Sequence, residues 1–243
     1  MNTKAMFFIL SILGISFAAC EKIDDRIVPS ATVTTRDYPL SAFGDLDVSD
    51  VFTVYVTFSE TVQELRIEAN DNLHSVIDID QEGGRLSIGL DKHVQLKGAE
   101  PVLKAYVTTN DLQRIAAAGA AKVILENDWN GSAVEIELTG ASKLQGVLQV
   151  GQLQAELTGA SNLAIQGTAD TFDLIAEGAS HLTGFEFATN AFVADLEGAC
   201  EASLTIHGEL EVKATGASTV YYQGNGVVTY QDLTGGSKII KVN

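Results

Sequence analysis

Serine and cysteine side chains, both able to act as nucleophiles, recur in this chain at a nearly fixed interval. The row is Ser142, Ser161, Ser180, Cys200, Ser218 and Ser237. A nucleophilic serine needs a general base beside it, and no histidine or carboxylate recurs with the row. His181 directly follows Ser180, but it is alone in its column, and we interpret it as a solvent-facing side chain. We therefore favour a structural role for the row over a catalytic one.

Carboxylates suggest a second kind of chemistry, because calcium takes carboxylate oxygens as ligands. The candidate ligands for a cation that bridges neighbouring segments are Glu135, Glu137, Glu156 and Asp173. The alternative, which we favour, is a solvated acidic face that keeps a β-sheet soluble and unpaired with neighbours. No Asp-x-Asp-x-Asp loop is present. The sequence thus indicates no metal site beyond these candidates and no cofactor.

Two further groups bear on ligands. Lys104, Asp111 and Arg114 are a mixed acidic and basic set of the kind that a carbohydrate-active enzyme needs, although ordinary outward side chains would look the same. Tyr221, Tyr222 and Tyr230 are an aromatic group that could form a contact patch for a glycan or a protein, or could pack the end of the fold.

The serine row belongs to a longer repeat that predicts the architecture. Each member stands two residues after a glycine in a Gly-Ala-Ser pattern, and the glycines are Gly119, Gly140, Gly159, Gly178, Gly198, Gly216 and Gly235. Seven copies at intervals of about 19 residues are typical of a solenoid, in which each repeat is one coil.

Apolar residues flank each glycine with a period of two. Positions four and two before it are apolar, with Gln231 as the exception, and apolar residues return four positions after it. This alternation predicts a strand on each side of the glycine corner. The fold class is therefore all-β, a parallel β-helix (β-solenoid) with coils of about 19 residues. We expect a right-handed helix, because parallel crossovers are nearly always right-handed.

The corner tripeptide has a structural explanation. Glycine permits a positive φ and a close approach of stacked backbones, and alanine fits where the interior narrows. Serine can bond a neighbouring backbone group or the serine one coil away. Cys200 occupies a serine position, and we expect it to be a small, partly buried side chain without a disulfide partner.

Residues 36–110 are also β in pattern but lack the tripeptide, whereas residues 111–243 carry it. Period-two segments such as Val51 to Phe58 predict short strands. Two arrangements stay open: these residues form less regular first coils that cap the solenoid, or they form a separate small sandwich packed on it.

The N-terminus predicts export and lipid anchoring. Residues 1–19 hold Lys4 and an apolar run from Ala5 to Phe17 that is too short to span a bilayer, and they are interpreted as a signal peptide. The run ends at Cys20 in a sequence that resembles a bacterial lipobox, so lipidation at Cys20 is expected, followed by a linker over residues 20–35. An ordinary secretory signal with an incidental cysteine is the alternative.

Charge disfavours two classes of partner. The formal net charge is −17, whereas nucleic acids and anionic membrane surfaces bind clustered lysine and arginine. We therefore expect no nucleic-acid partner and a membrane contact only through the N-terminal lipid.

The chain resembles the putative auto-transporter adhesin head family, also called the GIN domain or DUF2807 family. The resemblance covers residues 36–243 and rests on residues 43–49, 69–73 and 84–88 and on the Gly-Ala-Ser series. Departures are Ala121 and Cys200 at serine positions and Gly236 at an alanine position. The resemblance implies a right-handed β-helix common among Bacteroidetes envelope proteins, with no catalytic residues to transfer.

We therefore expect a non-enzymatic lipoprotein of the cell envelope, anchored to the outer membrane and presenting a β-helix surface as an adhesin or binding module. Whether it faces the periplasm or the cell surface stays open. The alternatives are a carbohydrate-active β-helix enzyme, or an envelope assembly component that docks or forms homo-oligomers through its C-terminal coil.

Overall fold

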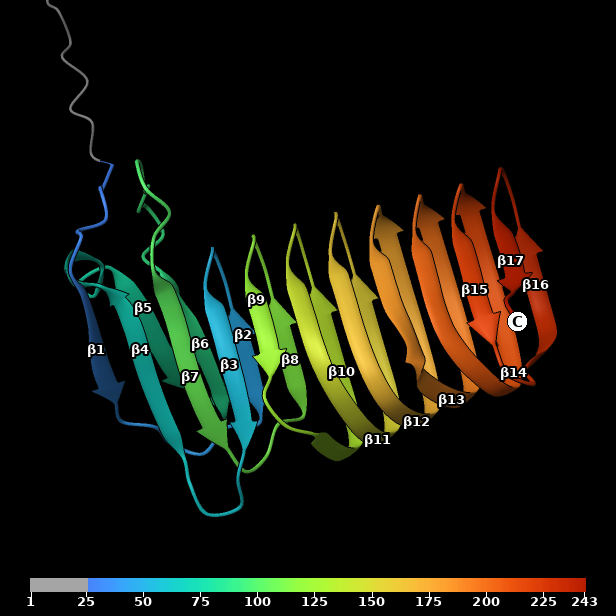
Figure 1. Ribbon diagram of the computed structural model, residues 1–243, viewed down its shortest axis with the longest axis horizontal. Coiled ribbons are helices and arrows are strands. Elements are labelled where there is room, and N and C mark those ends of the chain that lie inside the picture. Colours follow the sequence, from blue (N-terminus) through green and yellow to red (C-terminus); the bar gives the residue numbers. More distant parts are fainter. Residues whose placement is uncertain (1–25) are drawn as a thin grey trace, which may run out of the picture.

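A computed structural model describes residues 26–243 as a rod of stacked β-coils (Figure 1). The predicted signal peptide and the lipidation at Cys20 lie outside the described residues. The predicted β-solenoid is confirmed, because most strands pair in parallel with their equivalents one coil away. The elements in the N-terminal part are β1 (Val33–Tyr38), β2 (Asp45–Val48), β3 (Thr53–Phe58), β4 (Glu64–Asn70), the 3-10 helix η1 (Asp71–Leu73), β5 (Ile77–Glu82), β6 (Arg85–Leu90), β7 (Leu103–Thr109), β8 (Arg114–Ala117) and β9 (Lys122–Leu125).

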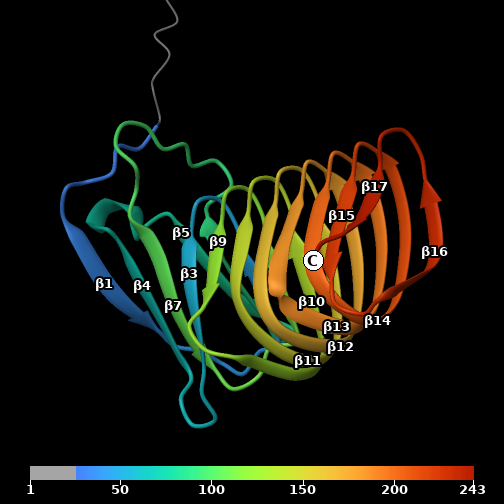
Figure 2. The same ribbon diagram turned by 45° about the vertical axis from the view of Figure 1, so that its right-hand side comes forward.

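In the C-terminal part, the long strands β11 to β14 pass around the lower edge of the rod and contribute to both sides (Figure 2). They are β10 (Trp129–Leu138), β11 (Lys143–Leu157), β12 (Asn162–Gly178), β13 (His181–Gly198), β14 (Glu201–Gly216), β15 (Thr219–Gln223), β16 (Val227–Leu233) and β17 (Lys238–Lys241).

The rod has two walls that meet at the glycine corners. We call wall A the strands that lead up to the corners, namely β6, β2, β8, β10, the C-terminal halves of β11 to β14, and β16. Wall B is formed by the strands that follow the corners, namely β7, β3, β9, the N-terminal halves of β11 to β14, β15 and β17. In both walls, alternate side chains point into the core and into solvent, as in β7, where every second residue is buried.

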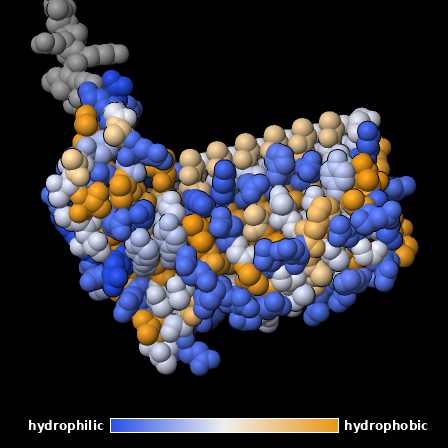
Figure 3. Space-filling view, viewed as in Figure 1, coloured by the Kyte–Doolittle hydropathy of each residue, from blue (hydrophilic) through white to orange (hydrophobic). Residues whose placement is uncertain are grey.

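The corners stack backbone on backbone. Gly159 has a φ of +82°, and a Cβ atom added to it would lie 2.6 Å from the carbonyl oxygen of Gly140 in the previous coil. Directly beside it, the Ala160 amide donates to that same Gly140 oxygen at 2.7 Å. The alanines of the corners are exposed and form a row of weakly hydrophobic residues along the rim (Figure 3). Glycine is therefore required for both its φ and its lack of a side chain.

The serines of the corners point inward. Ser142, Ser161, Ser180 and Ser218 are buried, and Ser161 Oγ donates to the Thr158 carbonyl oxygen at 2.7 Å. Cys200 is equally buried, with Sγ 3.4 Å from the Glu197 carbonyl oxygen, and burial raises the pKa of its thiol. Of the two partners considered for the serine hydroxyl, the side chain mainly donates to backbone carbonyls near its own corner.

The order of the first coils differs from the order of the sequence. β6 and β7 stack on β2 and β3, which in turn stack on β8 and β9. The coil of residues 45–58 is therefore placed between the coil of residues 85–109 and the first glycine-corner coil. Its corner holds Asp50 at a φ of +64° in place of glycine, a conformation that aspartate tolerates better than most residues.

Antiparallel strands cover the N-terminal end of the rod. β4 pairs with β7 and with β1 on one wall, and β5 pairs with β6 on the other. The core runs along the rod between the walls and includes the fully buried rings of Phe52, Trp129, Phe172, Phe187 and Phe192. Residues 45–109 thus contribute coils to the same solenoid, together with an antiparallel end layer.

Candidate functional site

Arg114 is the centre of a charged network on the outer surface of wall A. Its Nε and Nη2 atoms donate to the two carboxylate oxygens of Glu137 at 3.0 and 2.6 Å, and Nη1 donates to Asp47 at 2.7 Å. The three residues lie on β8, β10 and β2, neighbouring strands in wall A. Strand pairing places Asp45 opposite Arg114 and Asp47 opposite Ala116. Asp47 is therefore a diagonal neighbour of Arg114, on the same face of the sheet, within reach of the long arginine side chain.

Arg85 extends the network by one coil. It lies on β6, and its guanidinium is 3.4 Å from both Asp45 and Asp47. The Arg114 side chain is only 18% exposed, whereas that of Arg85 is 49% exposed. Planar bidentate contacts between arginine and carboxylate are strong and directional, so the Arg114 end of the network is the better-ordered part.

Charge and burial shift the titration of two neighbouring glutamates in opposite directions. The hydrogen bonds from Arg114 hold the pKa of Glu137 below its ordinary value of 4.5. Burial, followed by the hydrogen bond with Glu137, raises the pKa of Glu135. Contacts with Glu137 and Asp47 likewise raise the pKa of Arg114. Such a separation of two carboxyls is seen in acid–base catalysis, but both oxygens of Glu137 are already bound by Arg114.

A recess of about 410 Å³ lies beside this network. Small residues that include Ser49, Gly89 and Ala118 line it, with Asp78 and Lys92 also among the lining residues. Ser49 Oγ donates to the Asp50 carboxylate at 2.8 Å, and that carboxylate also accepts the Leu90 amide. Asp50 thereby fastens the corner of its own coil to β6, which gives it a structural role.

Wall B carries a second polar cluster near the N-terminal end. The Tyr55 and Tyr106 rings stack with centroids 5.1 Å apart. Lys104 Nζ donates to Glu68 at 2.8 Å, and the Tyr106 hydroxyl reaches the same carboxylate at 3.3 Å. The bond to Lys104 lowers the pKa of Glu68, and burial raises the pKa of Tyr106.

The mixed set considered for a carbohydrate-active enzyme is not brought together. Lys104 lies on wall B beside Glu68, and Arg114 lies on wall A. Asp111 is exposed in the loop that precedes β8. The partners of Arg114 come instead from β2 and β10.

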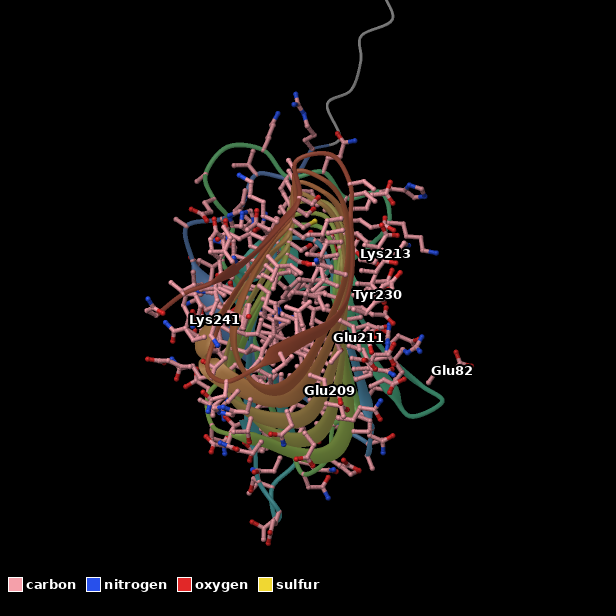
Figure 4. The ribbon with its side chains drawn as sticks, turned by 90° about the vertical axis from the view of Figure 1, so that its right-hand side faces the viewer. Glu82, Glu209, Glu211, Lys213, Tyr230 and Lys241 are labelled. Atoms are coloured by element: carbon pink, nitrogen blue, oxygen red, sulfur yellow. The ribbon has the colours of Figure 1, made fainter. Side chains whose placement is uncertain are left out.

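The three tyrosines also occupy different places. Tyr222 is buried, with the Lys241 ammonium 5.6 Å from its ring centroid. Tyr221 follows a corner on wall B, whereas Tyr230 lies on wall A and is 52% exposed. In the view along the rod, Tyr230 lies on the opposite side from Lys241 (Figure 4). The three side chains therefore do not share one surface.

The acidic candidates for a cation face outward on wall A. Glu137 and Glu156 are paired positions on neighbouring strands, and Asp173 pairs with Gln154. Among residues 26–243, no three acidic, histidine or cysteine side chains are arranged to hold a metal ion. His181 is exposed, as expected.

The sequence indicates that Arg114 lies on an outward-facing column of the repeat, but the repeat pattern alone does not identify its partners. Arg114 stands five residues before Gly119, in the same column as Glu135 before Gly140. Asp47 could be assigned to the site only by knowing that the coil of β2 stacks next to β8. The parallel pairing of β2 with β8 supplies that information.

Replacing Arg114 with glutamine is expected to lower the free energy of unfolding at pH 7 by about 1 kcal/mol, after allowance for solvent screening at the partly exposed carboxylates of Asp47 and Glu137. Because the folded pKa of Glu137 is depressed, this contribution is present above its ordinary pKa of 4.5 and is lost as the pH falls through the lower folded value. Urea unfolding at pH 7 and at progressively lower pH measures the difference.

Arg66→Gln is the matched control, because Arg66 and its partner Asp37 are 52% and 81% exposed. We expect no measurable change for it. An Arg114→Gln cost that stays constant below pH 4 would contradict the role assigned to Glu137.

No helix among the described residues meets the length and hydrophobicity needed to cross a membrane.

Comparisons with known proteins agree with this architecture. The profile of the DUF2807 family, described as "Putative auto-transporter adhesin, head GIN domain", matches residues 42–226. Curated proteins gave no match.

Several solved structures have the same fold at low sequence identity. A putative adhesin from Bacteroides fragilis superimposes with a TM-score of 0.81 at 22% identity, covering 89% of this chain and all of that one. A putative adhesin from Parabacteroides merdae gives 0.74 at 18% identity, with 90% and 100% coverage. A structure named a putative lipid binding protein, from Parabacteroides distasonis, gives 0.73 at 17% identity, again with 90% and 100% coverage.

Proposed function

Because the chain belongs to the DUF2807 family of putative auto-transporter adhesin head domains, we propose that it is a non-enzymatic binding module of the cell envelope. The observation that carries this proposal is the direction of the repeated side chains. The hydroxyl groups of the corner serines point into the core, whereas long rows of polar side chains face solvent on both walls. A rigid solenoid of this kind offers an extended surface for recognition.

The names of similar proteins support binding rather than catalysis. They describe adhesion in two cases and lipid binding in another, and likeness of fold alone does not assign a ligand. One observation favours the alternative of an enzyme: in the charged network on wall A, the pKa values of Glu135 and Glu137 are shifted in opposite directions. We favour binding, because Arg114 occupies both oxygens of Glu137, so that Glu137 is not free to act as the second carboxylate.

We also propose that the protein is held at the outer membrane through a lipid on Cys20. The support is the apolar segment that ends at Cys20 and the short linker that follows it. In cells, Cys20→Ser should move the protein from the membrane fraction to the soluble fraction. Retention of the variant in the membrane fraction would remove this part of the proposal.

A glycan and protein array tests the binding function directly. We expect the purified protein to bind one ligand class saturably, in the presence of calcium or of a chelator. Tyr221→Ala probes wall B, and Tyr230→Ala probes wall A, so the pair tells the two surfaces apart. Both positions face solvent, and neither change is expected to unfold the protein.

Absence of binding by the wild-type protein would favour the assembly alternative. Among residues 26–243, no strand pairs with the outer edges of β16 and β17, and uncovered strand edges tend to pair with other chains. Sedimentation would then show a concentration-dependent oligomer, whereas a monomer at all concentrations would exclude self-association through this edge.

A further inference from the structure

The two walls differ in charge, although the whole chain is strongly acidic. The acidic side chains on the strands of wall A are Asp45, Asp47, Glu135, Glu137, Glu156, Asp170, Asp173, Glu177, Asp195, Glu197, Glu209, Glu211 and Asp232, against Arg85, Arg114 and Lys213. The strands of wall B carry Glu186 and Glu201 against Lys104, Lys122, Lys143, Lys238 and Lys241. Figure 4 shows Glu209 and Glu211 on the side opposite Lys241.

A row of hydrogen-bond donors crosses six coils of wall B just below the corners. Strand pairing places Lys104 next to Thr53, Thr53 next to Lys122, and Lys122 next to Lys143. The row continues through Asn162 and His181 and reaches a carboxylate only at Glu201. Neighbouring members lie about 4.8 Å apart, which is the spacing between strands.

Among the described residues, Lys122 and Lys143 have no partner of opposite charge. Neither ammonium group forms an ion pair or a side-chain hydrogen bond with any residue between 26 and 243, whereas Lys104 is bound to Glu68. Like charges at directly paired positions of a sheet repel each other. An anionic group placed over this pair would relieve that repulsion and would gain two ionic contacts.

The surface next to the lysines is mostly uncharged. Two residues further along the same strands lie Tyr55, Ile124 and Gln145, again at paired positions. Tyr55 and Ile124 are partly exposed, and Gln145 is exposed. Hydroxyl, amide and apolar groups in regular rows suit a ligand that itself carries regularly spaced hydroxyl groups. The space-filling view shows this wall with mixed polar and apolar side chains (Figure 3).

We propose that wall B binds an acidic oligosaccharide along this row, with Lys122 and Lys143 contacting its carboxylate or sulfate groups. The proposal rests on the proposed binding function and names its ligand class and its face. A repeating sugar polymer can match the repeat of the coils, so that successive sugars meet successive donors. A nucleic acid fits less well, because the polymer would need many more phosphate contacts than two unpaired lysines provide.

Calorimetric titration tests the proposal with oligogalacturonate, dextran sulfate and neutral dextran as probes. We expect one or both acidic probes to bind the wild-type protein and dextran to bind much more weakly. The double variant Lys122→Gln/Lys143→Gln should bind the acidic probe about tenfold more weakly, and Lys122→Arg/Lys143→Arg should retain binding. Rising salt should weaken the wild-type interaction.

Lys213→Gln/Lys238→Gln is the matched control, because it removes the same charge from positions outside the row segment. Wild-type affinity in the Lys122→Gln/Lys143→Gln variant, or an equal loss in the control, would overturn the assignment. So would tighter binding of single-stranded oligodeoxythymidine than of either acidic sugar. If the array finds a ligand whose affinity is unchanged by substitution of Lys122 and Lys143, the proposed binding function is supported while this inference is wrong.

Discussion

Gly159→Ala is expected to lower the free energy of unfolding by about 3 kcal/mol or more. Alanine at a φ of +82° costs about 1–2 kcal/mol. The new methyl group would also lie 2.6 Å from the Gly140 carbonyl oxygen, so two coils must separate or shift. The shift would weaken the amide bond from Ala160 to Gly140 in the same stack. Urea unfolding followed by far-ultraviolet circular dichroism measures the loss.

Gly83→Ala is the control for this change. Gly83 also has a positive φ, +61°, but an added Cβ would meet nothing within 4 Å. Gly83→Ala should therefore lower the free energy of unfolding by only about 1 kcal/mol, the cost of placing alanine at a positive φ. Equal losses of stability for the two variants would mean that glycine is needed at the corners only for its positive φ. The close stacking of backbones between coils would then contribute nothing to stability.

Phe172→Ala is expected to cost about 3–5 kcal/mol, the range for emptying a buried aromatic position. Its ring is fully buried and contacts two other rings, with centroids 5.7 Å from Phe187 and 5.2 Å from Phe192. These rings come from two neighbouring coils, so the cavity would loosen the contact between them. The fluorescence of Trp129, the single tryptophan, reports unfolding.

Ile175→Ala on the same strand is the control, because Ile175 is 50% exposed. We expect it to change stability by no more than about 0.5 kcal/mol. A Phe172→Ala cost below about 1 kcal/mol would show that the walls are not held together by a packed interior at this position.

The glycine-corner coils could be predicted from the sequence because their signal repeats. Gly140, Gly159 and Gly178 meet the same steric requirement, so each copy confirms the others. The coil of residues 45–58 gives no such signal, because Asp50 stands in the corner position in place of glycine. The Asp50 carboxylate stabilises this corner by accepting the amide hydrogen of Leu90, which is forty residues away in the sequence. Sequence order also fails to indicate that a later segment stacks outside an earlier one.

The site residues were harder to predict for the same reason. Arg114 and Asp47 are 67 residues apart and meet only because β2 stacks on β8. The sequence suggests a patch that includes Tyr221 and Tyr222, yet adjacent strand residues point to opposite sides, and Tyr222 is the one that faces inward. The lysine row of wall B becomes visible only when paired positions are read across β3, β9 and β11.

Lysine acetylation read by mass spectrometry, with and without the acidic sugar that binds, tests the assignment of binding to wall B most directly. The account predicts that bound ligand protects Lys122 and Lys143, while Lys213 on wall A and the distant Lys238 react as before. Protection of Lys92 without protection of Lys122 and Lys143 would contradict it and would place the ligand in the recess beside the Arg114 network. Protection of Lys213 alone would also contradict it and would place the ligand farther along wall A, beside Asp195.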